Sequence, residues 1–216
     1  MNRLLSSLVL LALVSACVGP PNGRRPTSER PIALAPQSPE LKQCLAELGR
    51  YQARYALLPD RNYGSGCSTI SSVQLTGVGI PISNITAIQC PLALNLAIWT
   101  REAVQPAARQ VFGERVVRLE SFGSYSCRNV KGRPQMAGTR SEHATANAVD
   151  ISGFVLADGR RIAVDSGWNG TDDERRFLRS VRAAACKRFR TVLSPDFNAA
   201  HQDHFHFDLG RGPFCR

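Results

Sequence analysis

The histidines of this 216-residue chain are confined to two short segments. The heptapeptide HQDHFHF, residues 201–207, holds three of the four, and the fourth is His143 in SEHATANAVD. Histidines with unrelated roles in a core or on a surface would have no reason to cluster in this way. Imidazoles that meet a carboxylate can bind a metal ion, because zinc sites are built from His, Cys, Asp and Glu side chains. The distribution therefore indicates a metal site.

The second half of the heptapeptide has the alternation of a strand. Successive side chains of a strand point to opposite faces, so His204 and His206 would share one face while Phe205 and Phe207 share the other. A sheet that buries the two phenylalanines would then direct both imidazoles into a groove.

The same alternation distinguishes Asp150 in ANAVDISGF, because Val149 and Ile151 on either side of it would point to the opposite face. A buried carboxylate is costly unless it is paired. Two imidazoles and one carboxylate are enough for a catalytic zinc, which keeps a further position open. The helical HExxH signature is absent, so the ligands would come from a loop and two strands.

The two segments resemble known motifs. SEHATANAVD resembles the S-x-H-x-x-G-x-A-x-D motif of the D-Ala-D-Ala carboxypeptidase and murein endopeptidase superfamily (the LAS group, peptidase family M15). DHFH resembles its second motif, an acidic residue three before a zinc-binding histidine, and HxxHxH resembles the penicillin-insensitive murein endopeptidase. Over residues 41–216 the chain resembles the bacterial extensin-like C-terminal domain family of the same superfamily. Ala146 stands where the motif usually has glycine, which bears on the local backbone conformation.

The resemblance implies a role for each matching residue. His143, Asp150 and His206 would bind Zn²⁺. Asp203 would be the general base that takes a proton from the attacking water, and His204 would hydrogen-bond the developing oxyanion. A set of two histidines and one carboxylate also occurs in non-haem iron oxygenases. Those enzymes usually have the first histidine and the acid within three residues, and they need reductants that an exported protein lacks.

Three further residues are implied more loosely. His201 would support the site or help to bind substrate, Ser141 would bind substrate or orient His143, and Arg128 would bind substrate or stabilise the oxyanion. The implied activity is zinc-dependent hydrolysis of peptide bonds in peptidoglycan stem peptides or cross-links, by a carboxypeptidase or an endopeptidase. The alternative is a non-catalytic peptidoglycan-binding or envelope-structural lipoprotein that retains the fold. The base favours the enzyme, because a binding module needs no base beside its metal.

The first residues predict export. MNRLLSSLVLLALVSACVG has an arginine near its start, a short apolar run and a Val-Ser-Ala-Cys ending, the layout of a secretory signal. VSAC resembles the lipobox of bacterial lipoproteins, in which Cys17 would become the lipidated first residue. The alternative is an ordinary cleaved signal with an incidental cysteine. Val18 follows in place of an aspartate, so we expect a periplasmic protein held by lipid in the outer membrane of a Gram-negative bacterium.

Without Cys17, six of the seven cysteines remain. An even number in an exported chain predicts a disulfide framework. We expect Cys186 to pair with Cys215, which would hold the C-terminus to the helix before the histidine segment. The other pairings stay open. The six are Cys44, Cys67, Cys90, Cys127, Cys186 and Cys215.

Composition separates a tether from a domain. Residues 18–40 hold six of the 13 prolines and predict an extended tether, and residues 41–216 fit a single domain. The formal charge is +10. In an exported protein this charge argues for an anionic polymer or membrane surface as the partner and not for nucleic acid. The arginines of residues 175–190 would decorate a solvated helix face. A monomer is the expectation.

The elements that must position the site can also be predicted. The order of the elements favours an α+β domain with a small antiparallel sheet that carries the zinc site, flanked by helices and stabilised by disulfides. Helices are expected at 40–58, 91–112 with a break near Pro106, and 172–189. Residues 61–68 and 127–142 would be loops. Residues 73–75 and 80–82 are expected to be weak strands or irregular structure. Strands are expected at 116–125, 147–164 as a hairpin that turns at Asp158-Gly159, 191–196 and 204–210.

Overall fold

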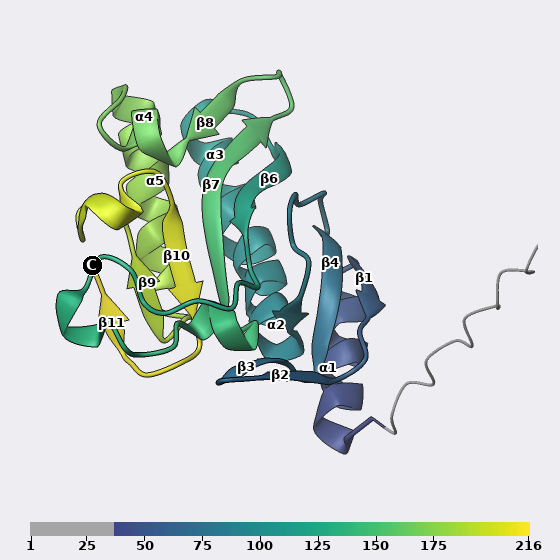
Figure 1. Cartoon of the computed structure of the whole chain (residues 1–216). Coiled ribbons are helices and arrows are strands. Elements are labelled where there is room, and N and C mark those ends of the chain that lie inside the picture. The colour runs from purple at the N-terminus through teal and green to yellow at the C-terminus, as the bar shows by residue number, and fades with distance from the viewer. Residues whose placement is uncertain (1–36) are drawn as a thin grey trace, which may run out of the picture. The chain divides into compact units, whose positions relative to one another are not determined.

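The computed structural model describes residues 37–216 (Figure 1). The predicted lipidation site Cys17, the signal segment and most of the proline-rich stretch lie outside these residues. The first helix begins at Pro39, two residues inside the stretch predicted as a tether, with Ser38 as its N-cap. Within residues 37–216, no helix has the length and apolar character needed to cross a bilayer.

The largest sheet carries the site. Its strand order is β11-β9-β10-β7-β6, and β8 pairs with β7. All neighbours are antiparallel except β11 and β9, so the predicted antiparallel α+β architecture is confirmed with one parallel pair at the edge. The strands are β6 (Val116–Gly123), β7 (Ala148–Leu156), β8 (Arg161–Ala163), β9 (Thr191–Leu193), β10 (Phe205–Asp208) and β11 (Phe214–Cys215).

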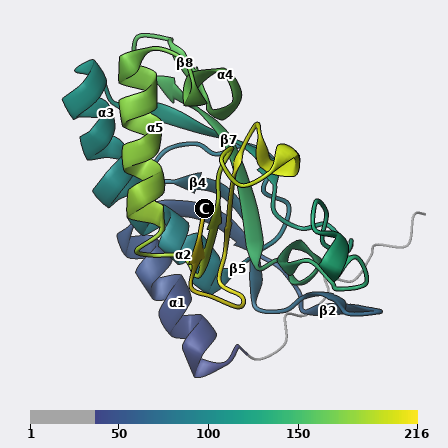
Figure 2. The same ribbon diagram turned by 90° about the vertical axis from the view of Figure 1, so that its left-hand side faces the viewer.

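Helices pack together beside this sheet. Figure 2 shows α2, α3 and α5 next to one another on one side of β7. The remaining helices are α1 at the start of the domain and the short α4 before α5. The bounds are α1 (Pro39–Arg50), α2 (Cys90–Trp99), α3 (Gln105–Phe112), α4 (Val164–Trp168) and α5 (Asp172–Ala185).

The alternation predicted for β10 is confirmed in the core. Phe205 and Phe207 are fully buried, and Phe207 packs edge-on against Trp99 of α2, with ring centroids 5.1 Å apart. Two buried phenylalanines contribute several kcal/mol together, at roughly 1.5–3 kcal/mol for each buried side chain. This burial fixes which face of β10 points away from the helices, and therefore where its histidines lie.

The predicted break in the helix 91–112 is also confirmed. Helix α2 ends at Trp99, a π-helical turn covers Thr100–Val104, and α3 starts at Gln105. Pro106 has no N–H to bond the carbonyl four residues before it, and its ring would clash with that carbonyl. The wider π-turn accommodates the proline while the chain stays helical.

Two predictions for residues 50–70 were wrong. The first helix ends at Arg50, not at residue 58, because Gln52 has a φ of 55° and turns the chain into β1 (Ala53–Leu57). Strand β1 pairs with β4 (Ser72–Val78), which also pairs with β5 (Ile88–Gln89). Tyr55 therefore belongs to a sheet and not to the helix stripe.

The predicted loop at 61–68 is a hairpin of β2 (Arg61–Gly64) and β3 (Cys67–Thr69). In the segment 80–82, expected to be a weak strand or irregular, Pro81 and Ile82 make isolated bridges.

Three disulfides link elements of the described domain, and the predicted Cys186–Cys215 bond is one of them. It joins the end of α5 to β11. Cys44–Cys90 joins α1 to α2. Cys67–Cys127 joins the β2–β3 hairpin to the loop that leads to the site.

Candidate metal centre

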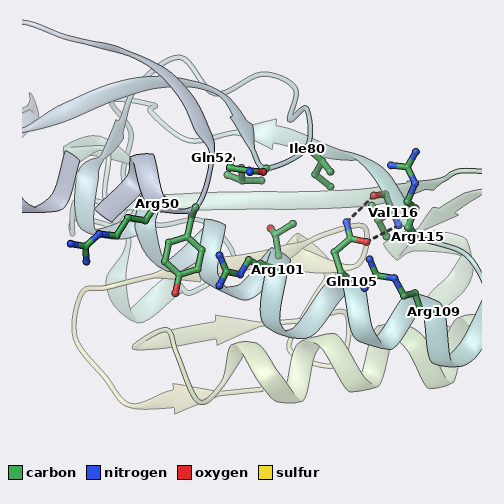
Figure 3. A pocket seen from close by; sticks show the side chains of 12 residues that line it. Arg50, Gln52, Ile80, Arg101, Gln105, Arg109, Arg115 and Val116 are labelled. Carbon is green, nitrogen blue, oxygen red and sulfur yellow. Dashed lines mark hydrogen bonds between the residues drawn. The ribbon is translucent and has the colours of Figure 1, made fainter. Parts of the chain in front are cut away.

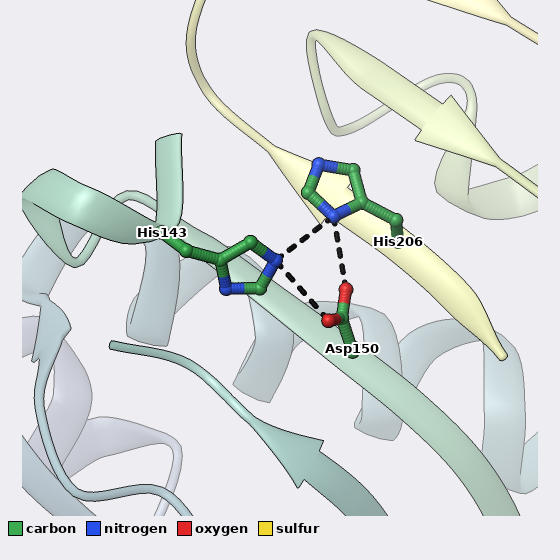
Figure 4. A group of neighbouring side chains, drawn as sticks. All are labelled: His143, Asp150 and His206. Atoms are coloured by element: carbon green, nitrogen blue, oxygen red, sulfur yellow. Dashed lines mark hydrogen bonds and ion pairs between the residues drawn. The ribbon is translucent and has the colours of Figure 1, made fainter. Parts of the chain in front are cut away.

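Three predicted ligands meet at one point (Figure 4). His143 lies on a single 3-10 turn (Glu142–Thr145), Asp150 on β7 and His206 on β10. The antiparallel register places His206 directly opposite Asp150. The pairing of two central strands therefore brings together residues that are 56 positions apart in the sequence.

The donor atoms of these residues face one another. His143 Nε2 lies 3.1 Å from Asp150 Oδ2 and 3.2 Å from His206 Nδ1, and His206 Nδ1 lies 2.9 Å from Asp150 Oδ1. All three side chains are buried. One atom from each residue can thus contact a single ion in their midst.

The other ring nitrogens determine the tautomers. His143 Nδ1 contacts the Ser124 carbonyl oxygen, which can only accept, so Nδ1 carries the proton and Nε2 keeps its lone pair. His206 Nε2 lies 3.0 Å from Asp208 Oδ2 and donates to it, so Nδ1, which faces Asp150, is the nitrogen left to bind a metal once its proton is released. Histidines that bind metals are held in the same way, with the second nitrogen hydrogen-bonded to a carbonyl or carboxylate.

The charges of the cluster also fit a cation. Burial works to raise the pKa of Asp150, but hydrogen bonds and charge from His143 and His206 outweigh it and hold that pKa well below its ordinary value. For His206, burial works to lower the pKa, yet the hydrogen bonds that the ring donates to Asp150 and Asp208, with the charges of these carboxylates, raise it to about 9. The ionised, buried carboxylate of Asp150 therefore lies beside a His206 ring that holds an additional proton. A metal ion bound by the three residues would replace that proton.

Asp208 was missed by the sequence reasoning. It is buried, its Oδ2 accepts from His206, and its Oδ1 accepts from the backbone N–H of Gly210 at 2.9 Å. The signal was available, because the same two-residue alternation that pairs His204 with His206 continues to Asp208.

His204 and Asp203 form a hydrogen-bonded pair at the edge of the cluster. His204 is buried, its Nδ1 lies 2.8 Å from Asp203 Oδ1, and its Nε2 lies 3.6 Å from Asp150 Oδ1. The Asp203 side chain is 44% exposed and meets the cluster through His204. The ring of Phe122 packs edge-on against His204, with centroids 5.7 Å apart.

The three loosely implied residues also lie near the cluster. Ser141 caps the 3-10 turn, and its hydroxyl accepts from the backbone N–H of His143, which favours the orienting role among the two considered. The ring of His201 lies 5.8 Å from that of His206. Burial, with the nearby His206 and His204, lowers the pKa of His201 to about 4, so it is neutral at pH 7. Arg128 lines the cavity described next.

A cavity of about 340 Å³ opens over the histidines. His143, His201, His204 and His206 all line it, whereas Asp203 does not. The charged residues of its remaining walls are five cations, Arg128, Lys131, Arg133, Arg140 and Arg211, and two acids, Glu142 and Asp208. The arrangement can hold a metal ion at the floor of a pocket that attracts anionic groups.

Ala146 has a left-handed conformation, with φ 57° and ψ 23°, where it ends the 3-10 turn of His143. This conformation costs an ordinary L-residue roughly 1–2 kcal/mol and glycine almost nothing, which explains why the motif usually has glycine there. Ala146 adopts this conformation itself, so the turn that carries His143 forms with alanine at the glycine position.

Comparison with known proteins gives one family and no individual relative. No curated protein and no solved structure matches the chain. A model of the family described as "Extensin-like protein C-terminus" matches residues 42–216, which include every described residue of the cluster and its cavity. The chain therefore belongs to the family of extensin-like protein C-terminal domains.

Proposed function

We propose that this protein is a zinc-dependent hydrolase of peptide bonds in peptidoglycan, related to the LAS group and peptidase family M15. The observation that carries the proposal is the convergence of His143 Nε2, His206 Nδ1 and an Asp150 oxygen, with the second nitrogen of each imidazole already held by an acceptor. Two nitrogens and one oxygen suit zinc, and three protein ligands leave a position open, as in catalytic sites. The motif resemblance supports the same assignment.

When bound, the zinc ion would polarise a peptide carbonyl and make deprotonation of water accessible near neutral pH. Asp203 is the proposed general base, and it acts at its own carboxylate or through His204, to which it is hydrogen-bonded. Because Asp203 occupies Nδ1 of His204, that ring can donate from Nε2 only when it is doubly protonated. Asp203 would stabilise this imidazolium while Nε2 hydrogen-bonds the oxyanion.

The cations of the cavity support an anionic substrate. Stem peptides carry free carboxylates, and arginine binds carboxylates through two parallel hydrogen bonds. Arg128 and Arg211 line the same cavity as His206, so such a carboxylate could lie beside the hydrolysed bond. Neutral His201 donates from Nδ1 to Asn198 Oδ1 at 2.7 Å, so its Nε2 can accept a hydrogen bond from the substrate. Cleavage as a carboxypeptidase and cleavage as an endopeptidase would both use this cavity.

The location proposed from the sequence is the periplasm, with a lipid on Cys17 and attachment to the outer membrane. Residues 18–36 would then separate the domain from the membrane surface and allow it to reach the wall. We propose a monomer with peptidoglycan as its partner and no role for nucleic acid.

Digestion of purified sacculi tests the function. The protein is incubated with sacculi in three states: with zinc, after removal of metal by a chelator, and after zinc is restored. Mass spectrometry of the released muropeptides should show cleavage in the first and third samples only, and the products identify the bond. Unchanged muropeptides in all three samples, together with retained binding to sacculi, would favour the non-catalytic wall-binding alternative.

A further inference from the structure

A second cavity, of about 300 Å³, lies away from the metal cluster and shares no lining residue with the cavity above it (Figure 3). Its walls come from the end of α1, the stretch from the π-turn into α3, and the start of β6. No aspartate or glutamate lines it. Four arginines do: Arg50, Arg101, Arg109 and Arg115.

The helical stretch presents one row of side chains to this cavity. Arg101, Gln105 and Arg109 are spaced four residues apart, so they project from neighbouring positions on one helix face. Figure 3 shows the three in sequence along the same helix. The row begins in the π-turn Thr100–Val104, and π-turns inside helices are frequent at functional sites.

Gln105 fixes the opposite wall. Its Nε2 donates to the Val116 carbonyl at 2.8 Å, and its Oε1 accepts from the Val116 N–H at 3.2 Å. Both backbone groups of the first residue in β6 are therefore bound by one side chain. This clamp holds the preceding residue, Arg115, at the cavity beside Arg109.

Three of the four arginines that line this cavity have no acidic partner within residues 37–216. Arg50 pairs with Glu47 at 2.7 Å, and Figure 3 shows its side chain directed away from the other arginines. Within residues 37–216, Arg101, Arg109 and Arg115 have no carboxylate at ion-pair distance. Arg101 instead lies over the ring of Tyr51, with its guanidinium carbon 4.6 Å from the ring centroid.

Glu102, the residue after Arg101, is directed elsewhere. Glu102 accepts from the Tyr51 hydroxyl at 3.2 Å and from Arg188 at 3.1 Å. Three like charges gathered around one concavity repel one another. A bound anion would remove this repulsion.

We infer that this cavity binds a phosphate group carried by a small ester or by a phospholipid headgroup. The planar guanidinium offers paired N–H donors that match phosphate oxygens. Arg109 and Arg115 lie at one end of the cavity and would bind oxygens of one phosphate, while Arg101, two helical turns from Arg109, would contact the group that carries the phosphate. The inference does not depend on the metal cluster, since the two cavities are separate.

Binding is measured by calorimetry with inorganic phosphate and with glycerol 3-phosphate, on protein kept in a chelator so that no metal binds the phosphate. Arg101→Gln and Arg109→Gln should each weaken binding of glycerol 3-phosphate about tenfold, because each removes charge-assisted hydrogen bonds. Arg61→Gln, which removes an exposed arginine of the β2–β3 hairpin, should leave the affinity unchanged. Arg211→Gln, in the metal-site cavity, tells the two cavities apart, because phosphate bound there would be weakened by this variant and not by Arg101→Gln or Arg109→Gln.

Sedimentation with vesicles separates the two sources of phosphate. Binding to phosphatidylglycerol and not to phosphatidylcholine vesicles, lost in Arg109→Gln, would identify a headgroup, while binding of glycerol 3-phosphate alone would identify a soluble ester. The inference is overturned if the wild type shows no saturable phosphate binding up to about 50 mM. It is equally overturned if Arg211→Gln weakens binding while Arg101→Gln and Arg109→Gln do not. Circular dichroism of each variant confirms that the fold is intact.

Discussion

The Asp208→Asn substitution tests whether the metal-binding tautomer of His206 is set by its neighbour. In the wild type, one Asp208 oxygen accepts from His206 Nε2 and the other accepts from the N–H of Gly210. Asparagine keeps only one oxygen. If that oxygen stays on Gly210, the amide NH₂ faces His206 Nε2, which must then accept. The ring proton moves to Nδ1, the nitrogen proposed to bind zinc.

The expected loss can be bounded. The opposite amide orientation would keep the tautomer but place two donors, the amide NH₂ and the Gly210 N–H, against each other in a buried site. Either orientation therefore costs free energy. Loss of an outer hydrogen-bond partner of a ligating histidine typically weakens metal binding 10–100-fold. This corresponds to about 1.4–2.8 kcal/mol of binding free energy.

The assay is competition for zinc between the protein and a chromophoric chelator. Asp165→Asn is the matched control, because Asp165 is exposed on α4 and its side chain makes no hydrogen bond within residues 37–216. The control should bind zinc as the wild type does. Equal affinity for Asp208→Asn and the control would refute the reasoning and would mean that His206 does not bind through Nδ1.

Three other predictions follow. His206→Ala should lose zinc and hydrolysis together, whereas Asp203→Asn should keep zinc and lose about 10²–10⁴-fold in muropeptide release; the reverse pattern would exchange the two roles. Replacement of Cys67 and Cys127 by serine should lower the free energy of unfolding by about 4 kcal/mol in urea denaturation, since the bond spans 60 residues and restricts the unfolded chain, and a change below about 1 kcal/mol would contradict this account. A labelled fatty acid should appear on the wild type and be absent from Cys17→Ser, and equal labelling of both proteins would leave the lipobox assignment without support.

Local sequence patterns correctly predicted the elements that are determined by neighbouring residues. The strand at β10 and the hairpin of β7 and β8 follow from two-residue alternation and from the Asp158-Gly159 turn, and the helix break follows from the ring of Pro106. Each of these signals acts within a few residues of the element that it defines. Their prediction therefore needed no knowledge of the partner strand or helix.

The wrong predictions concern segments whose structure depends on distant partners. Leu41, Leu45 and Leu48 set a helical stripe that Tyr55 continues by spacing alone, yet Tyr55 is opposite Leu75 in a sheet. The β2–β3 hairpin has four exposed residues in its first strand, so it carries no hydrophobic alternation. What holds it is the disulfide from Cys67 to a cysteine 60 residues later.

The same distinction between local signals and distant partners applies to the candidate site. Its ligands could be grouped from the sequence because the chain has so few histidines and because alternation places His206 and Asp150 on one face of their strands. The nitrogen that each ring offers could not be predicted, since for His143 it is set by the backbone carbonyl of Ser124. Every residue type has a backbone carbonyl, so the sequence does not show which carbonyl will accept this hydrogen bond. Asp208 acts through its side chain and could have been predicted from the two-residue alternation of the strand. When strand alternation identifies the ligands of a metal site, the next residue on the same face should therefore be considered as a partner of the last ligand, as Asp208 is for His206.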